Sequence, residues 1–481
     1  MIAPRSSLLA AAIGAAFASV PLAAQQVDRA HPPILPPPPA LRPPVVQTAT
    51  LPNGLQLAVV EMHKVPVVDV TLQLDAGTVR DAADLPGLAT FTATMLQQGA
   101  GSRGALEIAD ETAFLGASLN TGAGYDAATA QLHVPKRRLD SALDLLADVV
   151  LRPTFPDTEI ARQRDLRRAQ ILQQRDQPVA MANLAFSAIV FGADHPYGRP
   201  QYGTESSTAA LSRDRVVQFY QANYRPNAAR MLLVGDITLR EAVDLVTARF
   251  GGWARGEAPV VSDVQAPAAS ARTIYLVDKP GAAQSVFRIG QVGVSRTTPD
   301  YFPLEVLNTI LGGSFTSRLN QNLRETHGYT YGASSQFAMR HAAGPFLAAA
   351  SVVTAKTDSS LIEFMRELRR IRDDSVPQAE LDKAKAYIAL GLPGEFETTE
   401  GAARRFSELL LYGLPLDYFS TYIPRIAAVT AADVRRVARQ YLDPDHFAIV
   451  VVGDRSKIEP GLQALNEGPI VYRDMWGQAV Q

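Results

Sequence analysis

The stretch YRPNAARMLLVGDIT, from Tyr224 to Thr238, returns in altered form as LDPDHFAIVVVGDRS, from Leu442 to Ser456. The two copies align without gaps, so that Gly235 falls on Gly453 at an offset of 218 residues. In each copy a short apolar run ends in Val-Gly-Asp, a pattern typical of a buried strand followed by a turn. This repetition predicts that the chain contains the same structural unit twice.

Matches on either side of this stretch keep nearly the same offset. Ser212 and Thr430, also 218 residues apart, each precede a segment whose apolar residues recur every three or four positions. Such residues are typical helix N-caps. We predict two homologous domains, residues 46–255 and 273–473, joined by an extended linker at 256–272 that is rich in Ala, Pro and Ser.

The order of elements within each domain predicts the fold class. Two segments of period-two alternation open the first domain, followed by helical segments, a second strand pair, more helices and a closing strand. The second domain repeats this order. We expect an α+β protein in which each domain is a mainly antiparallel sheet with helices packed on one face.

The N-terminus has the features of an export signal. Arg5 precedes an apolar run from Leu8 to Val20, and small residues near Ala24 offer a cleavage site. We predict a signal peptide at 1–24 and a periplasmic or secreted location, with a retained membrane anchor as the alternative. Residues 25–45 follow as a Pro-rich spacer.

Composition excludes several classes of function. Apolar residues make up 47% of the 481 residues, charged residues make up 20%, and the net charge is −2. This balance is typical of a globular protein and gives no basic surface for nucleic acid. Because the chain has no cysteine, disulfides and thiolate metal sites are excluded.

Several motifs, in order along the chain, resemble one family. They include LPNGLQLAVVEMHKVPVV, LPGLATF, HPYGRPQYGT and LGGSFTSRLNQNLRETHGYTYGASS. Between about residues 48 and 460 the chain resembles the pitrilysin/insulinase family of zinc peptidases, the inverzincins, which includes the mitochondrial processing peptidase subunits. The resemblance implies the two-domain LuxS/MPP-like metallopeptidase fold.

The resemblance also shows what this chain lacks. The family's zinc helix reads His-x-x-Glu-His, and here Thr90 and Thr94 stand at the histidine positions and Ala93 at the general base. Gln163 and Gln170 stand where two glutamates, one of them the third ligand, are expected. Neither threonine nor alanine replaces imidazole or carboxylate at zinc. We therefore predict no zinc site and no cofactor in this chain.

The histidines give no alternative zinc helix. No two lie three or four residues apart, and we assign each a surface or packing role rather than a ligand role. The seven are His31, His63, His133, His195, His327, His341 and His446.

One pair of functional residues is retained. In the family an Arg and a Tyr seven residues apart face the substrate, and the resemblance places them at Arg324 and Tyr331 in LRETHGYTYG. A tyrosine hydroxyl stabilises a developing oxyanion, and a guanidinium orients a carbonyl. The alternative is that Arg324 pairs on its helix while Tyr331 packs at the start of a strand.

These features lead to one functional hypothesis and one alternative. The chain resembles the non-zinc subunit of a two-chain processing peptidase, inactive alone, which joins a zinc-bearing relative in a clamshell around peptides. Zinc is expected in the partner, and the Gly-rich LGGS segment (Leu311 to Ser314) is expected to permit opening. The alternative is a peptide- or protein-binding scaffold with no role in proteolysis.

Overall fold

The computed structural model describes residues 41–257, 265–267 and 270–480. The predicted signal peptide, the spacer up to residue 40 and parts of the predicted linker fall outside these residues. Within the described ranges, no helix is both long enough and apolar enough to cross a membrane.

The N-terminal half is built on a six-stranded sheet in the order β1-β2-β8-β3-β7-β6. Neighbouring strands are antiparallel except β2 and β8, which run parallel. The central strands β3 and β8 are almost entirely buried, and β6 forms one edge. The strands are β1 (Val46–Thr50), β2 (Gln56–Glu61), β3 (Val67–Leu74), β6 (Ser118–Ala123), β7 (Ala128–Pro135) and β8 (Ala229–Gly235), and β4 (Gly99–Ala100) and β5 (Arg103–Gly104) pair separately.

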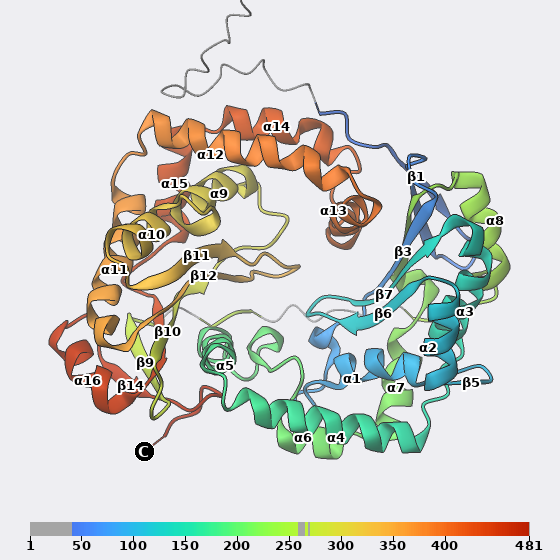
Figure 1. The fold of residues 1–481 in the computed structure, drawn as a ribbon, viewed down its shortest axis with the longest axis horizontal. Helices are drawn as coiled ribbons and strands as arrows, with labels where there is room; N and C mark the ends of the chain where they lie inside the picture. The colour runs from blue at the N-terminus through green and yellow to red at the C-terminus, as the bar shows by residue number, and fades with distance from the viewer. Residues whose placement is uncertain (1–40, 258–264, 268–269, 481) are drawn as a thin grey trace, which may run out of the picture. The chain divides into compact units, whose positions relative to one another are not determined.

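The C-terminal half repeats this sheet (Figure 1). Its order is β11-β12-β10-β13-β9-β14, so that β9-β13-β10-β12-β11 corresponds strand by strand to β2-β8-β3-β7-β6. The prediction of an α+β fold with two homologous, mainly antiparallel sheets is thereby confirmed, whereas the exact domain boundaries stay a prediction. The strands are β9 (Thr273–Asp278), β10 (Gln284–Val292), β11 (Thr330–Phe337), β12 (Pro345–Val353), β13 (Ala448–Gly453) and β14 (Ile470–Tyr472).

Helices connect and cover the strands in both halves. Ser212 and Thr430 are N-caps as predicted, since their hydroxyls accept hydrogen bonds from the amides of Arg215 and Asp433. The N-terminal half contains α1 (Leu88–Met95), α2 (Ala105–Phe114), α3 (Leu139–Leu151), α4 (Asp157–Gln174), α5 (Pro178–Phe191), α6 (Glu205–Ala210), α7 (Arg213–Asn223) and α8 (Leu239–Phe250). The C-terminal half contains α9 (Tyr301–Asn308), α10 (Arg318–Asn320), α11 (Thr357–Asp373), α12 (Gln378–Gly391), α13 (Thr399–Tyr412), α14 (Tyr418–Ala428), α15 (Ala431–Tyr441) and α16 (Arg455–Ala464).

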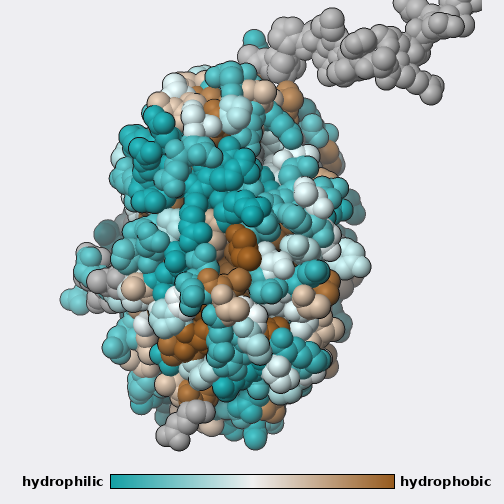
Figure 2. All heavy atoms as spheres, turned by 90° about the vertical axis from the view of Figure 1, so that its left-hand side faces the viewer, coloured by the Kyte–Doolittle hydropathy of each residue, from teal (hydrophilic) through white to brown (hydrophobic). Residues whose placement is uncertain are grey.

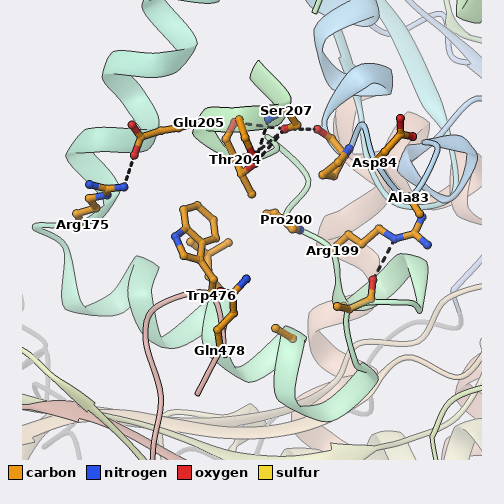
Figure 3. A pocket seen from close by; sticks show the side chains of 16 residues that line it. Ala83, Asp84, Arg175, Arg199, Pro200, Thr204, Glu205, Ser207, Trp476 and Gln478 are labelled. Carbon is orange, nitrogen blue, oxygen red and sulfur yellow. Dashed lines mark hydrogen bonds and ion pairs between the residues drawn. The ribbon is translucent and has the colours of Figure 1, made fainter. Parts of the chain in front are cut away.

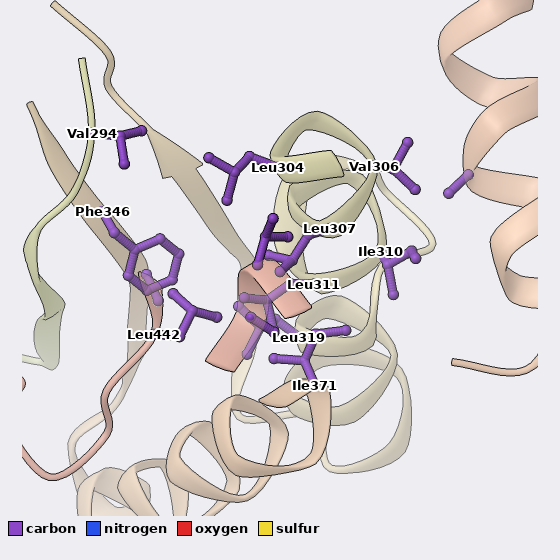
Figure 4. Close-up of a cluster of buried hydrophobic side chains, with 14 of the residues drawn as sticks. Val294, Leu304, Val306, Leu307, Ile310, Leu311, Leu319, Phe346, Ile371 and Leu442 are labelled. Carbon is purple, nitrogen blue, oxygen red and sulfur yellow. The ribbon is translucent and has the colours of Figure 1, made fainter. Parts of the chain in front are cut away.

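The core of the C-terminal half shows how the apolar periodicity is used. Leu304 and Leu307 of α9 and Ile371 of α11 point toward Phe346 on β12 (Figure 4). The apolar side chains on one stripe of α11 are fully buried, and each contributes about 1.5–3 kcal/mol; they are Leu361, Phe364, Met365, Leu368 and Ile371. The opposite side of α11 carries Arg366 and Arg370, both exposed, and the face around this helix is mostly hydrophilic (Figure 2).

Each sheet also packs against a helix from the other half. Helix α5 contacts β10 and β13, so that Phe186 packs with Val286 and Val450. Helix α13 contacts β3 and β8, and Leu232 and Val234 belong to the same core as the helices of the C-terminal half. The two halves therefore share buried surface, which adds a second covered face to the one predicted.

A buried aspartate links the two halves by hydrogen bonds. Asp126, in the turn between β6 and β7, accepts from the Tyr197 hydroxyl at 2.7 Å. Its other oxygen accepts from the His341 amide at 3.1 Å and from the Tyr412 hydroxyl at 3.3 Å, both in the C-terminal half. The Arg340 guanidinium lies 3.7 Å from the centre of the Tyr125 ring. We call these six residues the Asp126 junction.

Candidate functional site

The helix that resembles the zinc helix begins against a buried carboxylate. Asp81 accepts hydrogen bonds from the amides of Gly87 at 2.8 Å and Ala89 at 2.7 Å, which caps α1. Gly87 has φ +92°, and a Cβ there would lie 2.7 Å from the backbone of Gly203. Glycine is thus required both by the backbone conformation and by the close approach.

The positions expected to hold zinc ligands have ordinary structural contacts. Thr90 is only 4% exposed, and its hydroxyl donates to the Gln201 carbonyl at 2.8 Å. The Thr94 hydroxyl donates back to the Thr90 carbonyl at 2.9 Å. Ala93 is fully buried, and its carbonyl accepts from the Thr121 hydroxyl at 2.7 Å. These side chains and backbone groups are used to hold α1 in place.

An arginine from α4 fills the space beside Thr90. Nη1 of Arg167 donates to Thr90 Oγ1 and to the Gly87 carbonyl, both at 2.9 Å. Its guanidinium lies 5.1 Å from the ring centre of Phe91 and 5.4 Å from that of Tyr202. Arg167 is only 6% exposed. A fixed positive charge therefore lies beside one of the positions where the family would place a metal ligand.

Sequence reasoning missed Arg167 and selected its helical neighbours instead. Gln163 and Gln170 lie on α4 four residues before and three residues after it, half-buried and exposed respectively. The spacing could have identified Arg167, because residues three or four positions apart lie on the same helix face. It was not predicted as a site residue, because an arginine on a charged helix is usually solvated.

Burial shifts the ionisation of both charged groups around α1. Desolvation raises the pKa of Asp81 to about 7, against the stabilising effect of the amides of Ala89 and Gly87. Desolvation likewise lowers the pKa of Arg167 to about 10, opposed by Tyr202 and Asp81. The arginine stays charged at neutral pH.

The Asp81 carboxyl predicts a pH dependence of stability. Its pKa is near 3.9 in the unfolded chain and about 7 when folded, so the folded form binds more protons between these values. Stability relative to an Asp81→Asn variant is therefore greatest below about pH 4 and falls as the pH rises toward 7. Urea unfolding of both proteins at pH 4.5 and 7.5 should show the wild type losing about 1–3 kcal/mol relative to the variant. A difference independent of pH would contradict the assignment.

The other predicted site residues lie on consecutive elements of the C-terminal half. Arg324 belongs to the π-helical turn η7 (Gln321–Thr326), with its guanidinium 4.3 Å from the ring centre of Phe315 and Nε 3.5 Å from Glu325. Tyr331 lies on the edge strand β11 and is 91% exposed. Neither side chain is buried, and both are accessible to a ligand.

A β-bulge sets the direction of the tyrosine. Thr330 pairs with Val352 and Ala333 with Ala350, so Tyr331 and Gly332 together oppose Ser351. The Thr330 hydroxyl donates to the Ser351 carbonyl at 2.7 Å. Bulges re-aim side chains at sheet edges and are frequent beside active sites.

Buried polar contacts hold the arginine's turn in place. The Asn322 amide donates to Glu363 at 2.8 Å and to Glu367 at 2.9 Å, both on α11. Asn320 Oδ1 accepts from the Ala333 amide at 2.9 Å, which connects this turn to β11. These contacts fix the element that carries Arg324 relative to the strand that carries Tyr331.

The LGGS segment, where opening was expected, is packed against the second sheet. Residues Thr309–Gly313 form a π-helical turn, η6, and Leu311 and Gly312 are buried. A Cβ at Gly312 would lie 2.2 Å from the Ser335 amide nitrogen on β11. The glycine permits close packing against the strand, and opening at this segment stays a prediction.

A cavity of about 610 Å³ lies elsewhere in the molecule (Figure 3). Trp476, near the C-terminus, faces the Arg175–Glu205 ion pair across it, and Arg199 and Pro200 form another wall. Thr90, Arg324 and Tyr331 do not line it. The cavity therefore does not belong to the predicted peptide site.

Comparisons with known proteins agree with this architecture. Residues 57–205 match the family described as "Insulinase (Peptidase family M16)", and residues 210–388 match the one described as "Peptidase M16 inactive domain". The chain is 27% identical over 404 residues to an uncharacterized zinc protease of Mycobacterium leprae, covering 84% of this chain and 90% of that protein. An uncharacterized zinc protease of Bacillus subtilis is 24% identical over 409 residues, covering 85% and 98%.

Solved structures show the same fold. A peptidase M16 inactive domain from Pseudomonas fluorescens superposes with a TM-score of 0.80 at 27% identity, over 85% of this chain and 98% of that one. A protease from Helicobacter pylori superposes with a TM-score of 0.81 at 20% identity, over 86% and 100%. The fold is thus that of the two-domain M16-like peptidases. The chain belongs to peptidase family M16, the insulinase family, and is of the inactive type.

Proposed function

We propose that this chain is the zinc-less subunit of a two-chain M16 peptidase and contributes Arg324 and Tyr331 to the catalytic site of a zinc-bearing relative. The observation that carries the proposal is the contrast between the two halves. Beside α1 a buried arginine supplies fixed charge, whereas Tyr331 is 91% exposed on a bulged edge strand next to the turn of Arg324. Structural use explains the first arrangement but not the second.

The two exposed groups suit peptide hydrolysis in complementary ways. As water adds to a peptide carbonyl, negative charge develops on its oxygen, and the Tyr331 hydroxyl can donate a hydrogen bond to it. The Arg324 guanidinium has several donors in one plane and can orient a neighbouring carbonyl. The zinc of the partner would supply the activated water. The unpaired side of β6, at the edge of the first sheet, offers backbone groups to an extended peptide.

Location belongs to the same proposal. The charged flank, apolar run and small residues of positions 1–24 support export, and the spacer that follows would separate the folded part from the site of cleavage. We place the assembled peptidase in the periplasm.

Co-expression with a zinc-bearing M16 relative from the same genome tests the proposal. We expect the two chains to co-purify from the periplasmic fraction and to cleave unfolded peptides faster together than the relative does alone. The purified chain alone should be inactive. If the chains do not associate, or if association leaves the relative's activity unchanged, the proposal fails in favour of a binding scaffold.

A further inference from the structure

Three side chains converge where α13 crosses the first sheet. Asp69 on β3 and His133 on β7 are directly opposite each other in the antiparallel register, so they project from the same face. Glu400, in the first turn of α13, approaches them from the C-terminal half. One possible ligand atom from each of the three lies within 4.8 Å of the other two.

The distances are close to those between ligands of one ion, and the shorter of them is also a hydrogen bond between His133 and Asp69. Nδ1 of His133 lies 2.9 Å from Asp69 Oδ1 and 3.4 Å from Glu400 Oε1. Ligands about 2.1 Å from a transition ion, at tetrahedral or octahedral angles, lie about 3.0–3.4 Å apart. A single N–H at Nδ1, by contrast, serves only one carboxylate well.

A buried oxygen provides a second, independent observation. Asp69 is 7% exposed, and its Oδ2 is buried without a hydrogen-bond partner. The Thr399 side chain is within hydrogen-bonding reach of the Asp69 carboxylate and favours its charged form, but Oδ2 has no hydrogen-bond partner of normal geometry. Buried carboxylate oxygens are normally paired or coordinated to metal.

The charge of the cluster also favours a bound cation. In the part of the chain that the structure describes, neither Asp69 nor Glu400 forms an ion pair with a lysine or arginine. The cluster therefore holds two carboxylates and one imidazole, with no permanent positive charge among them. A divalent cation would supply the missing charge.

We propose that Asp69, His133 and Glu400 bind a divalent transition-metal ion, with Zn²⁺ the first ion to test. One imidazole and two carboxylates form a donor set for such ions, with water completing the coordination. The ion joins β3 and β7 to α13 and so fixes the first sheet to the C-terminal half. This role is structural, it lies apart from the threonines of α1, and it does not depend on the proposed partnership.

Calorimetric titration of the chelator-treated full chain with Zn²⁺ alone tests the proposal. We expect one equivalent to bind, Mg²⁺ and Ca²⁺ to bind far more weakly, and bound Zn²⁺ to raise the urea midpoint. His133→Ala and Glu400→Gln should each weaken binding by about 100-fold or more, because each removes a direct ligand. Glu400 is exposed, so its variant should fold normally.

His63 provides a matched control. It also lies between two carboxylates, Asp236 at 2.8 Å and Glu61 at 3.2 Å, but they contact opposite ring nitrogens and cannot share an ion with it. His63→Ala should leave Zn²⁺ affinity unchanged. Failure to bind Zn²⁺, binding that survives both ligand variants, or binding lost equally in His63→Ala would each overturn the proposal.

Discussion

A mixture of Tyr331→Phe chain with the zinc-bearing relative is expected to hydrolyse peptides about 10²–10³ times more slowly than the wild-type mixture. The substitution removes only a hydroxyl from a side chain that is 91% exposed, so folding and association should persist. The loss should fall on kcat, because an oxyanion forms only as the carbonyl is attacked. Steady-state kinetics on a fluorogenic peptide measure both parameters.

The Arg324→Ala variant tests whether the guanidinium contributes to substrate binding. Removing the guanidinium should raise KM as well as lower kcat, since carbonyl orientation is needed before and during attack. Tyr387→Phe and Arg435→Ala, exposed residues of α12 and α15, are the matched controls and should leave kinetics unchanged. If the Tyr331→Phe chain associates with the relative and the mixture shows wild-type rates, the catalytic role of Tyr331 is contradicted, whereas the family assignment is unaffected.

Asp126→Ala is expected to lower the free energy of unfolding by about 3–5 kcal/mol, because it leaves buried donors of both halves without an acceptor. The Tyr197 hydroxyl, the His341 amide and the Tyr412 hydroxyl all lose their shared partner. Urea unfolding measures the loss, with the exposed Asp382→Ala as the control. A loss below about 1 kcal/mol would show that the Asp126 junction does not hold the halves together.

The sequence repeat carried enough information for the fold. Because the two copies keep a constant spacing in the sequence, the same order of strands is predicted for both sheets. Period-two alternation then predicts which face of each strand is buried. The packing of α5 and α13 against the sheet of the opposite half could not be predicted from the repeat. Helix packing depends on which apolar surface the neighbouring half presents, and both sheets offer similar aliphatic faces.

Only those residues of the candidate site that belong to a local sequence motif could be predicted. Arg324 and Tyr331 came from a motif, and their functional role stays a prediction. Arg167 was not predicted because its burial depends on Phe91 and Tyr202, both of which are distant from it in sequence. His133 was assigned a surface or packing role because its neighbours Asp69 and Glu400 come from other elements, brought together only by tertiary packing.

The positive charge that Arg167 places beside α1 cannot be removed by a chelator. In a zinc peptidase, stripping the metal empties the space beside the ligand helix and removes its positive charge. Here the cation is covalently part of α4 and leaves only when the protein unfolds. A return to zinc catalysis by mutation would thus require removal of this guanidinium as well as new ligands at positions 90 and 94 and at 163 or 170.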